Sequence, residues 1–346
     1  MRSDIEAPPC CRATRVDLDG LSDEWAALLE ASGSRSPFLQ WAWQQVWWQD
    51  LAPDAAPLML AMRDAGRLVG IVPLLRTGGE LALSGDSEIC DYMDIICLPG
   101  AEVDVLDAAL AELSSEPWTR LVFWGLRADS PTLPALREAA ERHELRLQLE
   151  PEAICPRVPL AATWDAYLEG LTKKDRHELR RKIRRFTGLG GEIREYALSD
   201  PSEISAALAD FFRLHTISRQ DKAAFMTPLM ERFFRDMAAA LAPLDLIRLY
   251  FLELDGKRVA SVLAFDCGDE LWLYNSGFDP AFASASVGLV SKAFALKQAI
   301  AEGKACYDFL RGQEPYKYDL GAHDLQVFRC TLIRDLAPDV ETFDAE

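Results

Sequence analysis

The sequence contains no apolar run that approaches the roughly 18 residues that a helix needs to cross a bilayer. Near its start, the stretch MRSDIEAPPCCRATRVDLDG carries acidic residues where a secretory signal has an apolar segment. We therefore expect a cytoplasmic protein that does not insert into a membrane.

Cysteine pairs and histidine clusters at metal-binding spacing are also missing. The eight cysteines show no C-x-x-C spacing, and the four histidines lie far apart in the sequence. The cysteines are at positions 10, 11, 90, 97, 155, 267, 306 and 330. Because neither a disulfide framework nor a zinc site is indicated, we expect buried or incidental thiols and no metal.

Positive charge is scarce over most of the chain. The net charge is −18, which argues against nucleic acid or an anionic membrane as a partner for most of the surface. The exception is KKDRHELRRKIRR, residues 173–185, where eight Lys and Arg accompany two acids. This segment is a solvated helix face, pairs with the acidic rest of the chain, or binds an anionic ligand. Arg176 and Arg180, four residues apart on one helical face, are the candidate phosphate-binding pair.

The chain repeats itself. Gly66–Leu83 and Gly256–Leu273 agree at seven of 18 positions without a gap, at a shift of 190 residues. Each copy has an incoming strand, a glycine turn, an apolar strand, a second glycine turn and a further strand, which predicts an antiparallel meander. With 49% hydrophobic residues there is enough apolar material for two cores, so two similar domains are expected.

Each meander is followed by a helix and one more strand. After the second copy, apolar residues at helical spacing from Ser286 to a closing Gly303 predict an amphipathic helix, and 305–310 reads as a strand. The first copy has a helix near 104–113 and a strand at 121–124. A helix that connects two strands places them parallel in an otherwise antiparallel sheet.

These elements predict a mixed α/β (α+β) fold of two domains, each a mostly antiparallel twisted sheet with one parallel pair and flanking helices. We expect an N-terminal domain over 1–150, a proline-punctuated connector over 151–172 and a C-terminal domain over 173–346. Helices are expected at 201–218 and at 228–241, the second opened by Thr227 with a proline at the first helical position.

The order of strands and helix, with the small-residue helix entry SASVGL, resembles the GNAT acetyltransferase fold. More narrowly, KKDRHELRRKIRR, FFRLHTISRQDKAAF and YDFLRGQEPYK together resemble the CelD-like acetyltransferases of cellulose biosynthesis, which are tandem GNAT-like proteins more distantly similar to Fem-type aminoacyl transferases. The C-terminal resemblance covers roughly residues 165–335, and the internal repeat extends it to the first half.

The resemblance implies acetyl-CoA or another acyl-CoA as co-substrate, seated at the last helix entry. That entry lacks the Arg or Gln common in GNAT phosphate loops, but backbone N–H groups at a helix start bind diphosphate whatever the side chains. The first copy instead reads LPGAEVDVLDAAL, whose acids would repel a phosphate. The candidate cofactor-binding residues are therefore Ser276, Ser284, Ser286, Val287 and Gly288.

Acyl transfer needs a base for the acceptor, an acid for the leaving thiolate and a group that stabilises the oxyanion. The candidates implied by the resemblance are Glu314 as base, Tyr316 as acid and Asn275, or a backbone N–H near Ser276, at the thioester oxygen. Asp308 either faces the site or pairs with Arg311.

A structural interpretation of these polar residues stays open. Arg311 and Lys317 are candidate phosphate-binding residues, yet together with Glu314 they can also form an ion-pair network that fixes the loop. His215 is a candidate substrate-binding residue or a hydrogen-bonded packing histidine.

The expected function is acyl-CoA-dependent N- or O-acyl transfer to a small or sugar-linked acceptor, which the resemblance places in polysaccharide biosynthesis. The alternatives are Fem-like aminoacyl transfer from tRNA and a catalytically silent GNAT-like scaffold. The acidic composition disfavours a tRNA partner.

Overall fold

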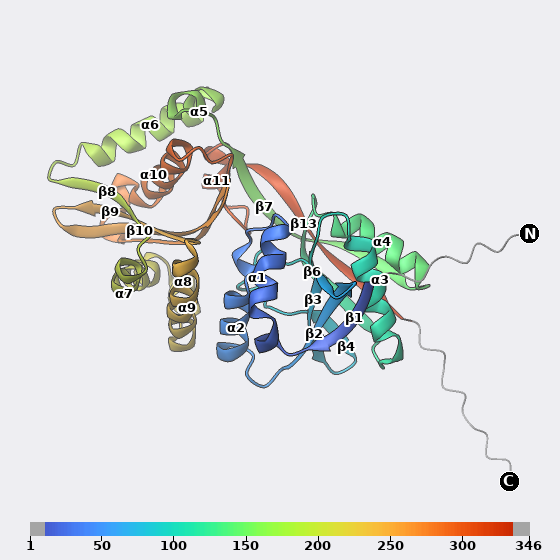
Figure 1. Cartoon of the computed structure of the whole chain (residues 1–346). Helices are drawn as coiled ribbons and strands as arrows, with labels where there is room; N and C mark the ends of the chain where they lie inside the picture. The colour runs from blue at the N-terminus through green and yellow to red at the C-terminus, as the bar shows by residue number, and fades with distance from the viewer. Residues whose placement is uncertain (1–10, 335–346) are drawn as a thin grey trace, which may run out of the picture.

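The computed structural model describes residues 11–334, which form one continuous 13-stranded sheet flanked by helices (Figure 1). The strand order is β1-β2-β3-β4-β6-β13-β7-β12-β11-β10-β9-β8, and β5 pairs with β3 at the side. This architecture confirms the expected mixed α/β class, with mostly antiparallel strands and a parallel pair in each half.

The first unit, residues 11–159, contributes seven strands and four α-helices. In chain order they are β1 Cys11–Val16, α1 Ser22–Ala31, α2 Trp41–Asp50, β2 Ala56–Asp64, β3 Arg67–Thr77, β4 Glu80–Leu83, β5 Ile96–Cys97, α3 Glu102–Glu112, β6 Arg120–Arg127, α4 Thr132–Arg142 and β7 Arg146–Pro159.

The second unit, residues 160–334, contributes six strands and seven α-helices. They are α5 Trp164–Gly170, α6 Lys173–Thr187, β8 Ile193–Leu198, α7 Pro201–Ser218, α8 Gln220–Phe225, α9 Pro228–Leu241, β9 Ile247–Leu254, β10 Lys257–Cys267, β11 Glu270–Phe278, α10 Val287–Ala301, β12 Cys306–Asp308, α11 Pro315–Asp319 and β13 His323–Ile333.

Local sequence signals account for the starts of α7 and α9. The hydroxyl of Thr227 accepts a hydrogen bond from the N–H of Met230 at the start of α9, and Asp200 caps α7 in the same way. Proline occupies the first position of both helices, where its missing N–H costs nothing.

The internal repeat is a structural repeat. β3 and β10 have equal length and begin 190 residues apart, and each is followed by a glycine turn and a strand that joins a parallel pair. Glu80 on β4 aligns with Arg120 on β6, and Glu270 on β11 aligns with Cys306 on β12. The predicted meanders, helix crossovers and parallel pairs are therefore confirmed.

β7 and β13 lie at the centre of the sheet and join the two units. β13, from the C-terminal end of the chain, lies between β6 and β7, while β7 lies between β13 and β12. Residues 151–159, expected as a connector, form the second half of β7 instead. Pro151 is tolerated because it lies at an irregularity in the pairing with β13.

Two hydrophobic clusters cover opposite faces of the second half of the sheet. One packs α10, α5 and α6 against β9–β12. The other is continuous from the first unit to α7 and α9, and includes Trp43, which stacks edge-on against Phe233 of α9. Helix α10 therefore lies on one face, and the contacts between the units lie on the other.

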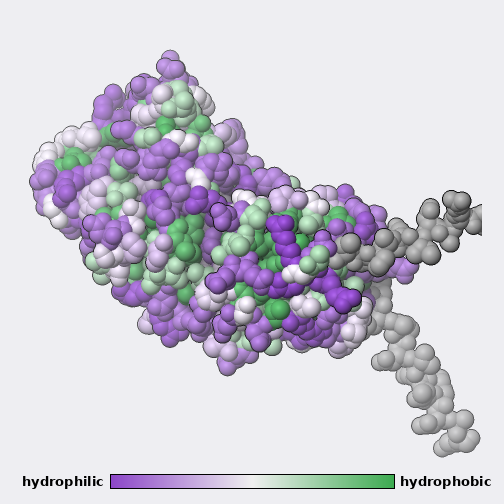
Figure 2. Space-filling model, viewed as in Figure 1, coloured by the Kyte–Doolittle hydropathy of each residue, from purple (hydrophilic) through white to green (hydrophobic). Residues whose placement is uncertain are grey.

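The view in Figure 2 shows a predominantly hydrophilic surface on which hydrophobic residues are interspersed. Among residues 11–334, no helix is long and apolar enough to cross a membrane. The seven cysteines in this range are unpaired and six of them are buried, whereas Cys10 lies outside the described residues.

Candidate functional site

β11 and β12 are paired only over a short length and then diverge. The parallel pairing joins Glu270–Trp272 to Cys306–Asp308, after which β11 continues to Phe278 beside β10 alone. We call the region between Leu273–Phe278 and residues 309–316 the divergence. The N-terminus of α10 and most of the candidate residues lie around it.

The two helix tips differ in charge as predicted. No acidic residue lies in the first turn of α10, whereas Glu102 and Asp104 lie in the first turn of α3. Ser286, before α10, has a left-handed φ of 59°, and its carbonyl accepts the N–H groups of Leu289 and Val290. An anion at the α3 tip would meet two carboxylates, and at the α10 tip none.

The α10 tip, residues 283–288, is uncharged and partly exposed. Ala283 and Ser284 are exposed. Arg185 of α6 donates to the Ser284 carbonyl at 3.0 Å and so brings positive charge to the tip. Val287 is buried and can reach a ligand only through its backbone. Gly288 lies against Phe278, since a Cβ there would come within 2.8 Å of that ring.

Asn275 and His215 form one pair on the opposite side of β11. His215 Nε2 lies 3.1 Å from Asn275 Oδ1, and the histidine is only 1% exposed. Burial lowers the pKa of His215 to about 4, so its imidazole is neutral near pH 7. This arrangement agrees with the interpretation of His215 as a hydrogen-bonded packing histidine. Its imidazole holds the side chain of Asn275 in place.

Lys317 holds the loop that follows β12. Its ammonium donates to the carbonyls of Leu310, Arg311 and Gly312 at 3.2, 2.8 and 2.8 Å. It also lies 2.9 Å from Glu314 Oε2, and its side chain is 2% exposed. Lys317 therefore already has partners for all its donors.

Glu314 and Tyr316 are shifted in opposite directions. Burial alone would raise the pKa of Glu314, but the charge and hydrogen bond of Lys317 outweigh it and lower this pKa. Burial raises the pKa of Tyr316, and the nearby charge of Glu314 adds to the effect. Tyr316 thus keeps its proton near neutral pH, whereas Glu314 is an ion-paired carboxylate.

Two lysines that the sequence analysis missed lie at the divergence. Lys222 of α8 donates to the Ser276 carbonyl, and Lys292 of α10 donates to the Gly288 carbonyl at 2.9 Å. The Lys292 ammonium also stands 5.0 Å from the centroid of the Tyr316 ring. For Lys292 the sequence offered one signal, since it is the lone charged residue in the first ten residues of α10.

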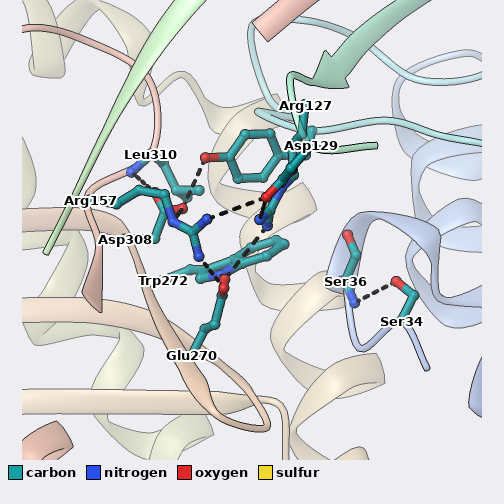
Figure 3. A network of polar contacts seen from close by, with 10 residues as sticks. Ser34, Ser36, Arg127, Asp129, Arg157, Glu270, Trp272, Asp308 and Leu310 are labelled. Carbon is teal, nitrogen blue, oxygen red and sulfur yellow. Dashed lines mark hydrogen bonds and ion pairs between the residues drawn. The ribbon is translucent and has the colours of Figure 1, made fainter. Parts of the chain in front are cut away.

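Asp308 is in a different network, on the face turned toward the first unit (Figure 3). It accepts hydrogen bonds from the Tyr92 hydroxyl at 2.9 Å and the Leu310 N–H at 2.8 Å, and Arg157 Nε lies at 3.1 Å. Burial raises the pKa of Asp308 to about 7 despite these partners. Its ion-pair partner is Arg157 and not Arg311.

Arg311 connects the loop to the first unit. Its N–H and its Nε donate to Asp91 at 2.9 and 3.1 Å, and its guanidinium lies 3.5 Å from Glu152. The expected network of Arg311, Glu314 and Lys317 is therefore divided. Lys317 pairs with Glu314, while Arg311 joins the two units.

Within the part of the chain that the structure describes, the basic helix α6 forms no ion pair with another element. Among residues 11–334, its ion pairs are those of Arg181 and Lys182 with Glu178 of the same helix. Arg176 and Arg180 lie on an open, mostly cationic face of this helix. The same face carries Lys173, Lys174, His177, Glu178 and Arg184. Of the three interpretations of this segment, pairing with the acidic rest of the chain is not seen among residues 11–334, where α6 lies at the outer edge of the second unit (Figure 1).

A cavity of about 420 Å³ lies where the units meet, beside the network of Figure 3. The loop with Ser34 and Ser36 lines one side, and Glu270 and Trp272 of β11 line another. The hydroxyl of Ser36 is buried and has no hydrogen-bond partner among the described residues. The charged residues that line this cavity are mostly acidic. The acids are Asp94, Glu102, Asp129, Asp269 and Glu270, and the bases are Arg35 and Arg127.

Comparison with known proteins agrees with this geometry. Residues 173–318 match the family model of the acetyltransferase (GNAT) domain. This range contains the divergence, the α10 tip, Lys222 and Lys292. A search of curated proteins found no match for the chain.

Solved structures extend the similarity to the whole chain. FemX superimposes with a TM-score of 0.66 at 11% identity, over 93% of this chain and 97% of that one. The C-terminal domain of a putative lysylphosphatidylglycerol synthetase from Agrobacterium fabrum gives 0.59 at 9% identity, over 91% and 92%. A tandem GNAT protein of the clavulanic acid biosynthesis pathway gives 0.50 at 12% identity, over 94% and 100%. At these identities the similarity establishes a GNAT-like acyltransferase fold.

Proposed function

We propose that the protein transfers an acyl group, acetyl in the first instance, from acyl-CoA to an amine or hydroxyl. The observation that carries the proposal is the uncharged α10 tip beside the divergence of β11 and β12, within the range that matches the GNAT domain. The acidic α3 tip argues against a second phosphate site in the first unit.

Each residue role follows from its surroundings. The co-substrate supplies the acyl group as a thioester. Tyr316, whose pKa is raised, can give its proton to the leaving sulfur, and the proposed base is Glu314, directly or through water. The α10 tip is the proposed diphosphate site, with Ser284, Ser286 and the backbone of Val287 and Gly288.

The cavity between the units, which neither Glu314 nor Tyr316 lines, is the proposed site for the part of the acceptor remote from the reacting group. Its carboxylates and its unpartnered Ser36 hydroxyl suit a small or sugar-linked molecule with hydroxyl or amino groups. A role in polysaccharide biosynthesis, as the CelD-like resemblance implies, belongs to this proposal.

Titration calorimetry with acetyl-CoA tests the proposal. Ser284→Glu places a carboxylate at the exposed tip and should weaken binding at least about tenfold, because the tip then repels phosphate as the α3 tip would. Ser284→Gln is the matched control of the same size and should bind like the unchanged protein. No binding by the unchanged protein at millimolar acetyl-CoA would reject acyl-CoA as co-substrate and favour the silent scaffold.

Aminoacyl transfer from tRNA is a second candidate. The observation that favours it is the cationic face of α6, which no carboxylate of another described element neutralises. Titration with bulk tRNA distinguishes the candidates, since salt-sensitive tRNA binding that Arg176→Gln and Arg180→Gln weaken would support aminoacyl transfer.

A further inference from the structure

The two lysines at the divergence lie without a counter-charge, Lys292 buried and Lys222 partly buried. Lys292 is 8% exposed, and among residues 11–334 neither Lys222 nor Lys292 forms an ion pair with a carboxylate. Each ammonium donates one hydrogen bond, Lys222 to Ser276 and Lys292 to Gly288. Because an ammonium carries three N–H groups, each lysine keeps two donors that no described protein group accepts.

Other buried lysines of the same protein show what a purely structural role looks like. Lys317 has three carbonyl partners and Glu314, and Lys304 lies 2.5 Å from Asp266 and 2.7 Å from the Gly268 carbonyl. Both are satisfied within the fold. Lys222 and Lys292 differ from them in having spare donors at the place where β11 and β12 separate.

The charges around the pair leave an excess of positive charge. Glu314 is the carboxylate that acts on both lysines, and Lys317 already pairs with it. Arg219 and Asp221 form their own ion pair on α8. The other titratable groups near the pair are neutral, namely His215 and Tyr316. An ammonium removed from water without a partner costs several kcal/mol.

We propose that Lys222 and Lys292 form a subsite that binds a phosphate group at the divergence of β11 and β12. Lys292 approaches from the second turn of α10 and Lys222 from the side of Ser276 on β11, so a phosphate between them would meet charge from both sides. The inference rests on the proposed function only for the identity of the ligand. The phosphate belongs to acyl-CoA or to a phosphorylated acceptor.

This arrangement makes binding depend on pH. Burial lowers the pKa of Lys292 to about 7 and that of Lys222 to about 8, so both lose protons between pH 6.5 and 9. A bound phosphate supplies the missing negative charge and raises both pKa values. Phosphate binding must therefore take up protons and become weaker as the pH rises.

Titration calorimetry of the full chain with inorganic pyrophosphate and with CoA, at pH 6.5 and pH 9, tests the subsite. Both ligands should bind at least about tenfold more weakly at pH 9, with proton uptake seen as a heat that depends on the buffer. Lys222→Met and Lys292→Met should each lose about tenfold in affinity at pH 6.5 and reduce the pH dependence. Lys297→Met, an exposed position on the same helix, is the matched control.

Circular dichroism establishes that each variant is folded. If Lys292→Met is not folded, Lys222→Arg is the variant that tests the subsite. Arginine retains the positive charge and should retain the affinity, but it removes the proton uptake of Lys222. Equal affinities and pH profiles in the unchanged protein and the lysine variants would overturn the subsite, as would a lack of pyrophosphate binding at millimolar concentration.

The same experiments can reject acyl-CoA as co-substrate without rejecting the phosphate subsite. Pyrophosphate binding that needs the lysines, without any CoA binding, would retain the subsite and reject acyl-CoA. Pyrophosphate that competes with CoA assigns the subsite to the phosphates of the cofactor. Pyrophosphate that binds beside CoA assigns it to the acceptor.

Discussion

The surroundings of Tyr316 and Glu314 shift their pKa values in opposite directions. Burial keeps Tyr316 protonated, which suits an acid, whereas the ion pair with Lys317 makes Glu314 a weaker base than a free carboxylate in the same place. Glu314 can therefore hold the loop in place through Lys317 as well as accept a proton in the reaction. Substitution of Glu314 can separate the structural role from the catalytic one.

Tyr316→Phe and Glu314→Gln should each lower turnover by about 10²–10⁴-fold, because each removes a proton-transfer group while leaving its shape. The measurement is thiol release from acetyl-CoA with an identified acceptor. Tyr318→Phe is the matched control, since its hydroxyl bonds to Asp324 outside the divergence. Full activity of both variants would refute the role assignments, and lost stability without lost turnover in Glu314→Gln would make that residue structural.

His215 should make the protein sensitive to acid. Its pKa is about 4 when folded and about 6.5 when unfolded, so the unfolded chain binds the proton more readily between these values. Stability is present above pH 6.5 and is lost as the pH falls toward 4. His215→Gln removes this contribution and should reduce the loss between pH 7 and 4.5 by about 2 to 3 kcal/mol.

Urea unfolding of both proteins at the two pH values measures this difference, and the shared carboxylates cancel in the comparison. Equal losses in the two proteins would mean that His215 is protonated without penalty in the folded state.

At the scale of elements, β11 and α7 are in direct contact through a glycine. A Cβ at Gly277 would lie 2.3 Å from the backbone N of His215 and 2.4 Å from the carbonyl carbon of Leu214. Backbone atoms in a helix cannot move aside singly, so an added methyl group must push α7 away from the strand that lines the divergence.

Gly277→Ala should therefore destabilise the protein by about 3 kcal/mol or more and disturb the pair of His215 and Asn275. Gly170→Ala, where no atom lies within 4 Å of the new Cβ and φ is not positive, is the control and should stay within about 1 kcal/mol. Denaturant unfolding gives both values. A stable Gly277→Ala protein would show that the packing of α7 on β11 is looser than in this structure.

Elements with local signals could be predicted from the sequence. Glycine turns and apolar alternation marked both meanders, and Thr227 with the proline after it marked the start of α9. The acids at the start of α3 and their absence at α10 likewise follow from neighbouring residues. These features depend on contacts between residues close in the chain.

Features that depend on contacts between residues far apart in the sequence were not predicted. Prolines at 151 and 156 suggested a connector, but β13 and β12 supply pairing on both sides of β7 and hold those residues in a strand. Asp308 could not be assigned to Arg157 without that pairing. Lys222 and Lys292 were missed because the one local signal, a lone lysine in the apolar part of α10, does not reveal whether the ammonium has a partner.

At the scale of the whole molecule, neither unit has a complete sheet of its own. The sheet of the first unit includes β13, which lies at the end of the second unit, and β12 of the second unit pairs with β7 of the first. A single hydrophobic cluster also runs from α2 to α9. The placement of the domain boundary stays a prediction, but the stability of the units is shared.

We therefore expect the protein to unfold in one cooperative transition, although chains of this length commonly unfold in steps. In calorimetry the van't Hoff and calorimetric enthalpies should agree. The fragments 1–162 and 163–346, which separate β7 from β13, should each lack cooperative unfolding alone and regain it when mixed, because each then receives the strand that it lacks. Two separate endotherms, or a cooperatively folded fragment 163–346, would show that the second unit is stable without β7 and that the shared strands join domains that are already complete.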